Sequence, residues 1–75
     1  LDFRVYPNPT NSVWNIKSEQ KIELVQVFDL QGKEVIRLTT NAETVSINAA
    51  GLTNGVYFVK VNAAKTTQSL KLVKK

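Results

Sequence analysis

Few side chains in this sequence could carry out chemistry, because its 75 residues include no cysteine and no histidine. Their absence excludes thiol nucleophiles, disulfides, zinc sites of the usual nitrogen and sulfur type, and every triad that uses imidazole as its base. Asp29 stands in a motif, but no second carboxylate lies at ligand spacing around it, so we interpret it as a turn acceptor rather than a metal ligand. The sequence therefore predicts a protein that is not an enzyme and that holds no cofactor and no metal.

The chain carries a net positive charge, but the charge does not indicate a specific ligand. Ten Lys and Arg residues against six Asp and Glu residues give a formal net charge of +4. This favours solubility and a weak attraction to anionic groups, and the plainer interpretation is a solvated charged surface. Nucleic-acid binding would need basic residues clustered with exposed aromatics, whereas the aromatics here fall inside apolar strands. We expect no nucleic-acid partner.

The length limits the chain to one domain with a small core. A domain of this size buries roughly 60% of the surface that its unfolded chain exposes. No stretch approaches the ~20 apolar residues of a membrane span, so direct membrane insertion is not expected. The chain begins at Leu1 rather than Met, with no basic head followed by an apolar run. We expect residues 1–75 to form a single domain excised from a larger protein, and we expect it to be a monomer.

Strands are the elements that must position these residues, because apolar residues alternate with period 2 in short runs separated by turn residues. The run at 22–28 is the most apolar and is expected to lie centrally, covered on both sides. Seven short strands at this spacing predict an all-β fold, an immunoglobulin-like sandwich of mainly antiparallel strands. The expected strands are 3–6, 13–17, 22–28, 35–38, a short one around Val45 and Ile47, 55–61 and 67–73.

Three connections carry specific turn chemistry. The prolines of segment 7–9 lack backbone donors, which confines that segment to a sheet edge or a loop. Asp29 and Gly32 fit a type I turn in which the carboxylate accepts from backbone amides and the glycine is left-handed. Gly55 is expected at a positive φ, and Tyr57 resembles the corner tyrosine of sandwich domains, which bonds back to the preceding connection.

These motifs, together with a basic final strand, stand in one order along the chain. They are Tyr-Pro-Asn-Pro at 6–9, Asp-x-x-Gly-Lys-x-Val at 29–35, Leu-x-x-Gly-x-Tyr-x-Val-Lys-Val at 52–61 and a Lys-rich strand at 71–75. Together they closely resemble the type A C-terminal sorting domain of the type IX secretion system of Bacteroidetes. The resemblance covers nearly the full chain, although segment 62–65 lacks the glycine that the family often has there. Outside the last two motifs, the matching residues are Tyr6, Pro7, Asn8, Pro9, Asp29, Gly32, Lys33 and Val35.

The resemblance implies a sorting signal for a cargo protein that precedes Leu1. Such domains fold in the periplasm, are recognised by the type IX machinery and direct passage across the outer membrane to the cell surface or the extracellular space. A surface sortase commonly removes them. We expect the last strand and the loop before Gly55 to form the recognised face, with lysines supplying positive charge. Those lysines also fit edge protection, because Lys on an edge strand discourages sheet-to-sheet pairing. The candidate recognition residues are Gly55, Tyr57, Lys60, Lys71, Leu72, Val73, Lys74 and Lys75.

A second hypothesis is an adhesive or carbohydrate-binding module of the fibronectin type III kind, attached to an extracellular enzyme. Sugar binding would need an exposed aromatic platform, and Trp14 is the best candidate for it, ahead of Tyr6, Tyr57 and the three phenylalanines Phe3, Phe28 and Phe58. The alternation of Trp14 with Ile16 predicts burial instead.

Overall fold

The computed structural model describes residues 3–75, and their regular structure consists entirely of β-strands. Within that range no helix has the length and apolarity needed to cross a membrane. All strand pairs are antiparallel. The strands are β1 (Phe3–Tyr6), β2 (Val13–Phe28), β3 (Glu34–Asn48), β4 (Gly55–Ala63) and β5 (Thr66–Lys74).

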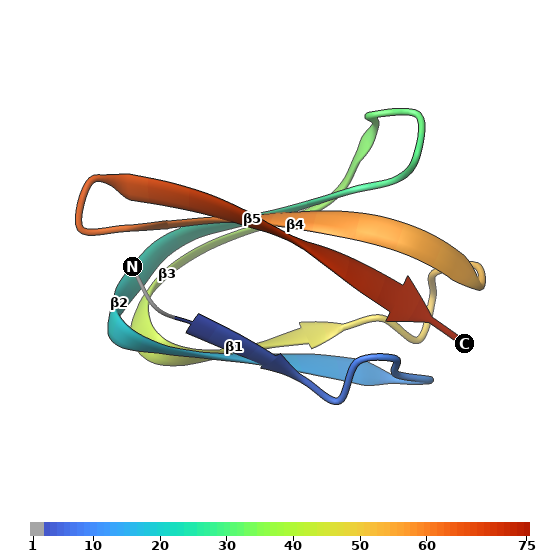
Figure 1. Ribbon diagram of the computed structural model, residues 1–75, viewed down its shortest axis with the longest axis horizontal. Coiled ribbons are helices and arrows are strands. Elements are labelled where there is room, and N and C mark those ends of the chain that lie inside the picture. Colours follow the sequence, from blue (N-terminus) through green and yellow to red (C-terminus); the bar gives the residue numbers. More distant parts are fainter. Residues whose placement is uncertain (1–2) are drawn as a thin grey trace.

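Two long strands, β2 and β3, run through both layers of the structure (Figure 1). The first half of β2 pairs with β1 and with the last part of β3, which forms one layer. The second half of β2 pairs with the first part of β3 and with β4, and β4 pairs with β5, which forms the other layer. The last strand is therefore an edge strand of the second layer.

The all-β, immunoglobulin-like sandwich expected from the sequence is confirmed in class, but the prediction of about seven short strands is wrong. Residues 3–75 form five strands, because the runs 13–17 and 22–28 belong to one continuous β2, and 35–38 and 45–47 to one continuous β3. The polar segments between these runs contain no glycine or proline. They therefore carry no strong chain breaker, and the backbone stays extended while it turns from one layer into the other.

The bend is made by irregular pairing rather than by a loop. The register between β2 and β3 shifts between Lys17 and Ile22 and again between Ile22 and Leu24. Extra residues on one strand of a pair bend it and increase its twist. Inside the bend the Ser18 hydroxyl accepts a hydrogen bond from the Gln20 amide at 3.1 Å, and the Thr40 hydroxyl donates to the Ile22 carbonyl.

The core lies between the two layers. Trp14 is fully buried there, as expected, and its ring stands edge-on to Tyr57 with 6.0 Å between centroids. In the central strand, Val25 and Val27 are fully buried, whereas Leu24 and Phe28 on its other face are only half-buried. The expected cover on both sides is therefore only partial. The remaining buried cluster comprises Ile16, Ile22, Val45, Ile47, Ala49, Val59, Val61 and Leu72.

Candidate functional site

The C-terminal strand β5 changes character halfway along its length. From Thr66 to Lys71 every residue is exposed, whereas Leu72 is fully buried and Lys74 is only 7% exposed. Alternate side chains of a strand point to opposite faces, so Leu72 and Lys74 share the face that looks into the sandwich. The second half of β5 is consequently part of the core, although it lies at a sheet edge.

The Tyr-Pro-Asn-Pro loop holds this second half in place. The Asn8 carboxamide accepts from the Val73 amide at 2.9 Å and donates to the Lys71 carbonyl at 3.1 Å. Two residues later the Thr10 amide donates to the Val73 carbonyl at 3.0 Å, and its carbonyl accepts from the Lys75 amide at 2.7 Å. Asn8 thus pairs with the edge as a neighbouring strand would, and Thr10 continues in a parallel bridge. The loop joins the first layer to the edge of the second.

Thr10 also fixes the far end of this loop. Its hydroxyl donates to the Val13 carbonyl at 2.6 Å and accepts from the Val13 amide at 3.2 Å, at the start of β2. Only 4% of Thr10 is exposed. The loop is therefore anchored at both ends by hydrogen bonds, as the stiffness of a segment with two prolines would favour.

Tyr57 forms the corner that the sequence predicts. Its hydroxyl donates to the Thr53 carbonyl at 2.7 Å and lies 3.1 Å from the Thr53 hydroxyl. Gly55 between them has a φ of +152°, in the region that side chains with a Cβ rarely adopt. The hydrogen bond from Tyr57 to Thr53 therefore ties the start of β4 to the loop that precedes it.

We expect Tyr57→Phe to destabilise the domain, because it removes the hydroxyl bond to a part-buried carbonyl. A lost hydrogen bond of this kind costs about 0.5–1.5 kcal/mol, which is several degrees of melting temperature for a domain of this size. Thermal unfolding followed by circular dichroism measures it. Tyr6→Phe is the matched control, because Tyr6 is 47% exposed and its hydroxyl has no hydrogen-bond partner among residues 3–75. Equal losses in the two variants would contradict the corner assignment.

The Asp29 hairpin has the turn chemistry expected of it. The Asp29 carboxylate accepts from the amides of Gln31 and Lys33, both at 2.9 Å, and Gly32 has a φ of +85°. The Gly32 amide donates to the Asp29 carbonyl at 3.1 Å. Within residues 3–75 no group of three or more acidic, Cys or His side chains is placed to hold a metal ion. Asp29 is a turn residue.

The structure brings the four motifs together in pairs. The first motif lies against the last through Asn8, as described above. The second lies beside the third, because the Asp29 hairpin and the loop from Thr53 to Tyr57 line a common shallow hollow of about 230 Å³. In each pair, two motifs that are distant in sequence lie side by side in the folded chain.

The proposed recognition residues separate into a buried and an exposed group. Tyr57, Leu72 and Lys74 are buried. Lys74, which the sequence places on the recognised face, is not accessible there: its ammonium group lies 3.5 Å from the Asn54 side-chain oxygen and 3.3 Å from the Lys75 carbonyl. The exposed members are Gly55, Lys60, Lys71 and Lys75, and Val73 is half-buried.

The outer face of the second layer carries two aromatic side chains that the sequence ranks below Trp14 as candidates for a binding platform. Phe58 is 41% exposed, and Phe28 lies opposite it on β2. The Lys60 ammonium group sits 5.8 Å from the centroid of the Phe28 ring, within cation–π range. The signal was present in the sequence, since both residues fall out of phase with the buried residues of their strands.

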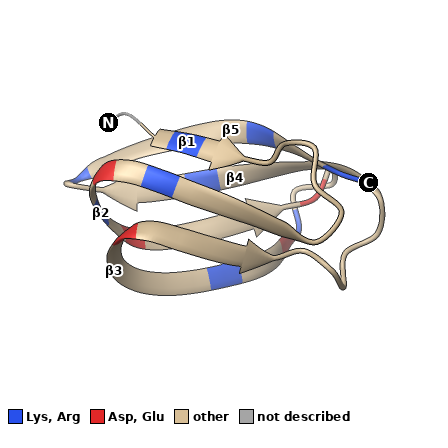
Figure 2. Cartoon of the chain, turned by 90° about the horizontal axis from the view of Figure 1, so that it is seen from below, with Lys and Arg blue, Asp and Glu red and all other residues tan. Residues whose placement is uncertain are grey.

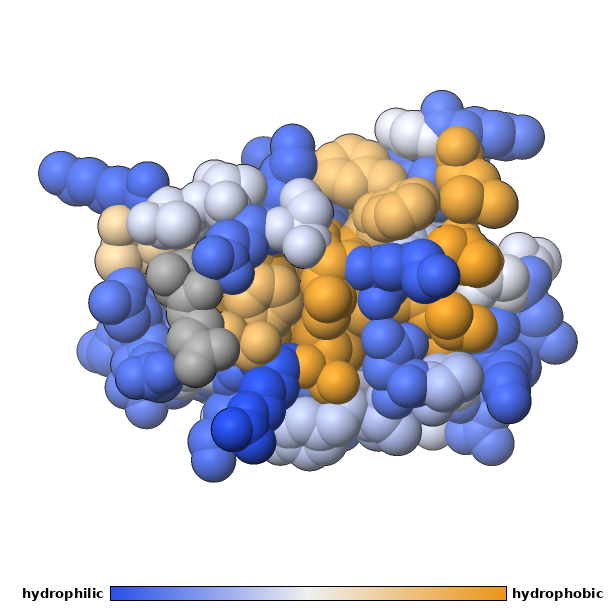
Figure 3. Space-filling view, viewed as in Figure 1, coloured by the Kyte–Doolittle hydropathy of each residue, from blue (hydrophilic) through white to orange (hydrophobic). Residues whose placement is uncertain are grey.

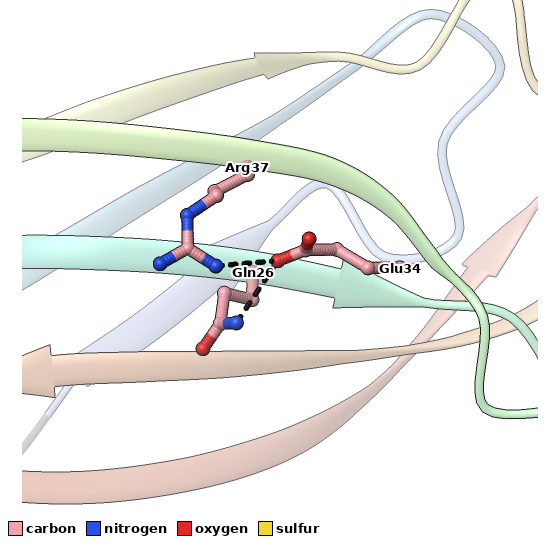
Figure 4. Close-up of polar contacts among 3 residues, drawn as sticks. All are labelled: Gln26, Glu34 and Arg37. Atoms are coloured by element: carbon pink, nitrogen blue, oxygen red, sulfur yellow. Dashed lines mark hydrogen bonds and ion pairs between the residues drawn. The ribbon is translucent and has the colours of Figure 1, made fainter.

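On the same face, Glu34 accepts two side-chain hydrogen bonds (Figure 4). Gln26 donates to its carboxylate at 2.9 Å, and Arg37 donates to the same oxygen at 3.1 Å. The bond from Gln26, and then the bond and charge of Arg37, lower the pKa of Glu34 below its ordinary value. Ionised Glu34 therefore favours the folded chain at neutral pH, and this contribution is lost as the pH falls through the lowered pKa.

We expect Gln26→Ala to raise the pKa of Glu34. The Gln26 bond is the largest single cause of the lowered pKa, and the charge of exposed Arg37 is screened by solvent. A titration of the Glu34 side-chain carboxyl followed by NMR measures it. Gln20→Ala, elsewhere on β2, is the control. An unchanged pKa in Gln26→Ala would contradict the assignment.

The chain matches a known protein family over almost its whole length. The family model described as a secretion system C-terminal sorting domain matches residues 4–75. The chain belongs to this family. The match spans nearly the whole chain, so the resemblance to type IX sorting domains that the sequence predicts is confirmed.

A solved structure shares the fold of this sorting domain. It is that of PorZ, described as an essential bacterial surface component of the type-IX secretion system of Porphyromonas gingivalis. The TM-score is 0.78 and the sequence identity is 22%. The alignment covers 97% of this sorting domain and 11% of the PorZ chain, so the likeness concerns the fold of one part of that protein. No curated protein matches the chain.

Proposed function

We propose that this sorting domain directs a cargo protein, joined before Leu1, through the type IX secretion machinery and across the outer membrane. The observation that carries the proposal is the family match over residues 4–75. The domain is non-catalytic and is a substrate of the machinery. It folds in the periplasm as a single monomeric domain, and a surface sortase then removes it from cargo that reaches the cell surface or the medium.

Recognition in this proposal depends on a folded domain that presents exposed lysines. Lys60, Lys71 and Lys75 are exposed on or next to β4 and β5. Tyr57, Leu72 and Lys74 are buried, so they contribute by maintaining the fold that presents these lysines. A folded surface presents its groups without the ordering cost that a disordered peptide incurs on binding.

The alternative function, carbohydrate binding, requires an exposed aromatic platform, and its best candidate, Trp14, is buried. Trp14 has no exposed surface. Of the other aromatics, Tyr6 is exposed on β1, whereas Phe58 and half-buried Phe28 lie opposite each other on β4 and β2 in the other layer. The family match over residues 4–75 favours sorting over carbohydrate binding.

A reporter experiment tests the proposal. An export signal and a fluorescent protein are fused before residues 1–75 and expressed in a bacterium with a type IX system. We expect surface or medium fluorescence, and mass spectrometry of the released reporter should show loss of residues 1–75. Retention of the parent fusion in the periplasm would overturn the sorting function, and a surface reporter that keeps residues 1–75 would overturn sortase removal.

Substitutions separate recognition from folding better than a truncation does. Deleting residues 71–75 would also remove buried Leu72 and the bonds to Asn8. We therefore compare a variant with Lys60, Lys71 and Lys75 changed to Gln against one with Lys17, Lys21 and Lys33 changed to Gln, which has the same net charge. Only the first should be retained in the periplasm, with an unchanged melting temperature. Equal export of both variants would exclude a role for the lysines on and next to β4 and β5.

A further inference from the structure

The first half of the β5 edge presents backbone groups that nothing in residues 3–75 binds. In an antiparallel pair, successive residues alternately face the partner strand and face away from it. The Val73 amide and carbonyl face away from β4, because they bond to Asn8 and Thr10. By the same alternation the amide and carbonyl groups of Thr67 and Ser69, and the Lys71 amide, also face outward.

Asn8 marks the limit of the covered part of this edge. Its carboxamide reaches the Lys71 carbonyl and no further towards the start of β5. From Thr66 to Lys71 the strand is exposed on both faces as well as along its edge. The edge has no proline and no bulge, whereas its shortness and Lys71 discourage pairing with strands that lack complementary charge.

Apolar side chains lie beside this free edge. The inward face of β5 continues from Leu72 to Leu70, which is 38% exposed because the other layer does not cover it. The edge strand of that layer, β1, lies on the same side of the sandwich as β5 (Figures 1 and 2). Its inward residues Phe3 and Val5 are half-buried. An apolar area is visible in the middle of this side in Figure 3.

The charge around the edge has one sign. From residue 44 to residue 75 the chain contains five lysines and no Asp or Glu, and β4 and β5 accordingly show only blue bands in Figure 2. Lys71 stands on the edge strand itself, Lys60 pairs with Ser69 across to β4, and Lys65 lies in the turn between the strands. Such a surface attracts acidic segments.

We propose that the free edge of β5, from Thr66 to Lys71, binds an extended acidic segment of a partner protein as an additional strand. Main-chain hydrogen bonds supply affinity in this mode of recognition, and alternate side chains supply specificity. Apolar side chains of the segment contact Leu70 on the inward face, and its carboxylates face Lys71 and Lys60 on the outward face. This mode of binding adds a contact surface to the proposed sorting function. It rests on that function only for the identity of the partner, which would be a component of the secretion machinery.

The probe is an eight-residue peptide of alternating Val and Glu with blocked ends, added to the purified 75-residue chain. Amide hydrogen exchange and NMR shifts are measured. Without peptide, the amides of Thr67, Ser69 and Lys71 should exchange fast and those of Gln68 and Leu70 slowly. With peptide, the first three should become protected and shift most. A peptide N-methylated at every residue, which cannot donate backbone hydrogen bonds, should not bind.

Two variants of equal charge provide the matched comparison. Lys71→Glu should weaken binding by about fivefold, as expected for reversal of one exposed charge next to the ligand. Lys33→Glu, in the Asp29 hairpin, should change it by less than about twofold. Ser69→Pro removes one outward amide and should weaken binding by about tenfold or more. Dispersed NMR spectra of each variant show that it is folded.

Several results would overturn the proposal. They are absence of binding at millimolar peptide, equal binding of the N-methylated peptide, equal weakening by Lys33→Glu and Lys71→Glu, and shifts centred on Phe28 and Phe58. The last would indicate the outer face as the docking surface. Reporter export that depends on the exposed lysines, combined with any of these results, would leave the sorting function standing and remove the added strand.

Discussion

Leu72→Ala is expected to lower the melting temperature of the domain by about 10 °C or more. Leu72 is fully buried on the inward face of β5, and truncating a buried leucine to alanine costs about 2–5 kcal/mol. For a domain of 60–100 residues, each kcal/mol corresponds to about 4–8 °C. Thermal and urea unfolding of the purified chain measure the loss. The loss should reduce export in the reporter experiment through unfolding rather than through loss of a contact with the machinery.

Leu70→Ala is the matched control for this prediction. It is the same substitution on the same face of the same strand, two residues earlier, but Leu70 is 38% exposed. The variant leaves no enclosed cavity, so we expect less than half the destabilisation of Leu72→Ala. Equal losses in the two variants would show that the first and second halves of β5 are packed alike, which would contradict the exposure of the first half.

Asn8→Ala is expected to destabilise the domain by about 1–2 kcal/mol, although Asn8 is exposed. The substitution removes an acceptor for the Val73 amide and a donor to the Lys71 carbonyl. Each such bond contributes about 0.5–1.5 kcal/mol, with the lower values expected where water can replace the partner. Unfolding by urea measures the stability, and hydrogen exchange of the Val73 amide, which should become faster, measures the edge directly.

Two further variants control for this effect. Asn11→Ala changes an exposed asparagine in the same connection that has no side-chain hydrogen bond among the described residues, and it should be nearly neutral. Asn8→Asp keeps the acceptor and loses the donor, so it should fall between the parent and Asn8→Ala. If Asn11→Ala cost as much as Asn8→Ala, the specific pairing of Asn8 with β5 would be refuted.

Local turn chemistry is the part of this structure that the sequence predicts best. The Asp29 carboxylate bonds, the positive φ of Gly32 and Gly55 and the corner bond of Tyr57 all depend on residues within four positions of one another. Short-range sterics and hydrogen bonds favour such features, so they can be predicted from local sequence alone. The burial of Trp14 followed in the same way from alternation along a single strand.

The strand count could not be predicted in this way, because it depends on pairing between strands. Segments 18–21 and 39–44 are polar, which is typical of connections between strands. In the folded chain they are the places where β2 and β3 pass from one layer to the other while remaining paired. A polar segment at a bend and a polar loop have the same composition, so only the register of the pairing distinguishes them.

The sequence by itself determined the strands' alternation, the turns, the basic character of the last third and the family. Only the tertiary structure decided which lysines and which part of the last strand are accessible. Lys71 and Lys74 are three residues apart on one strand and have the same chemistry, but alternation places them on opposite faces, and the first is exposed whereas the second is buried. Accessibility is set by what packs across from a residue, and the neighbours of Lys74 come from other segments of the chain, namely the Thr10 backbone and the Asn54 side chain.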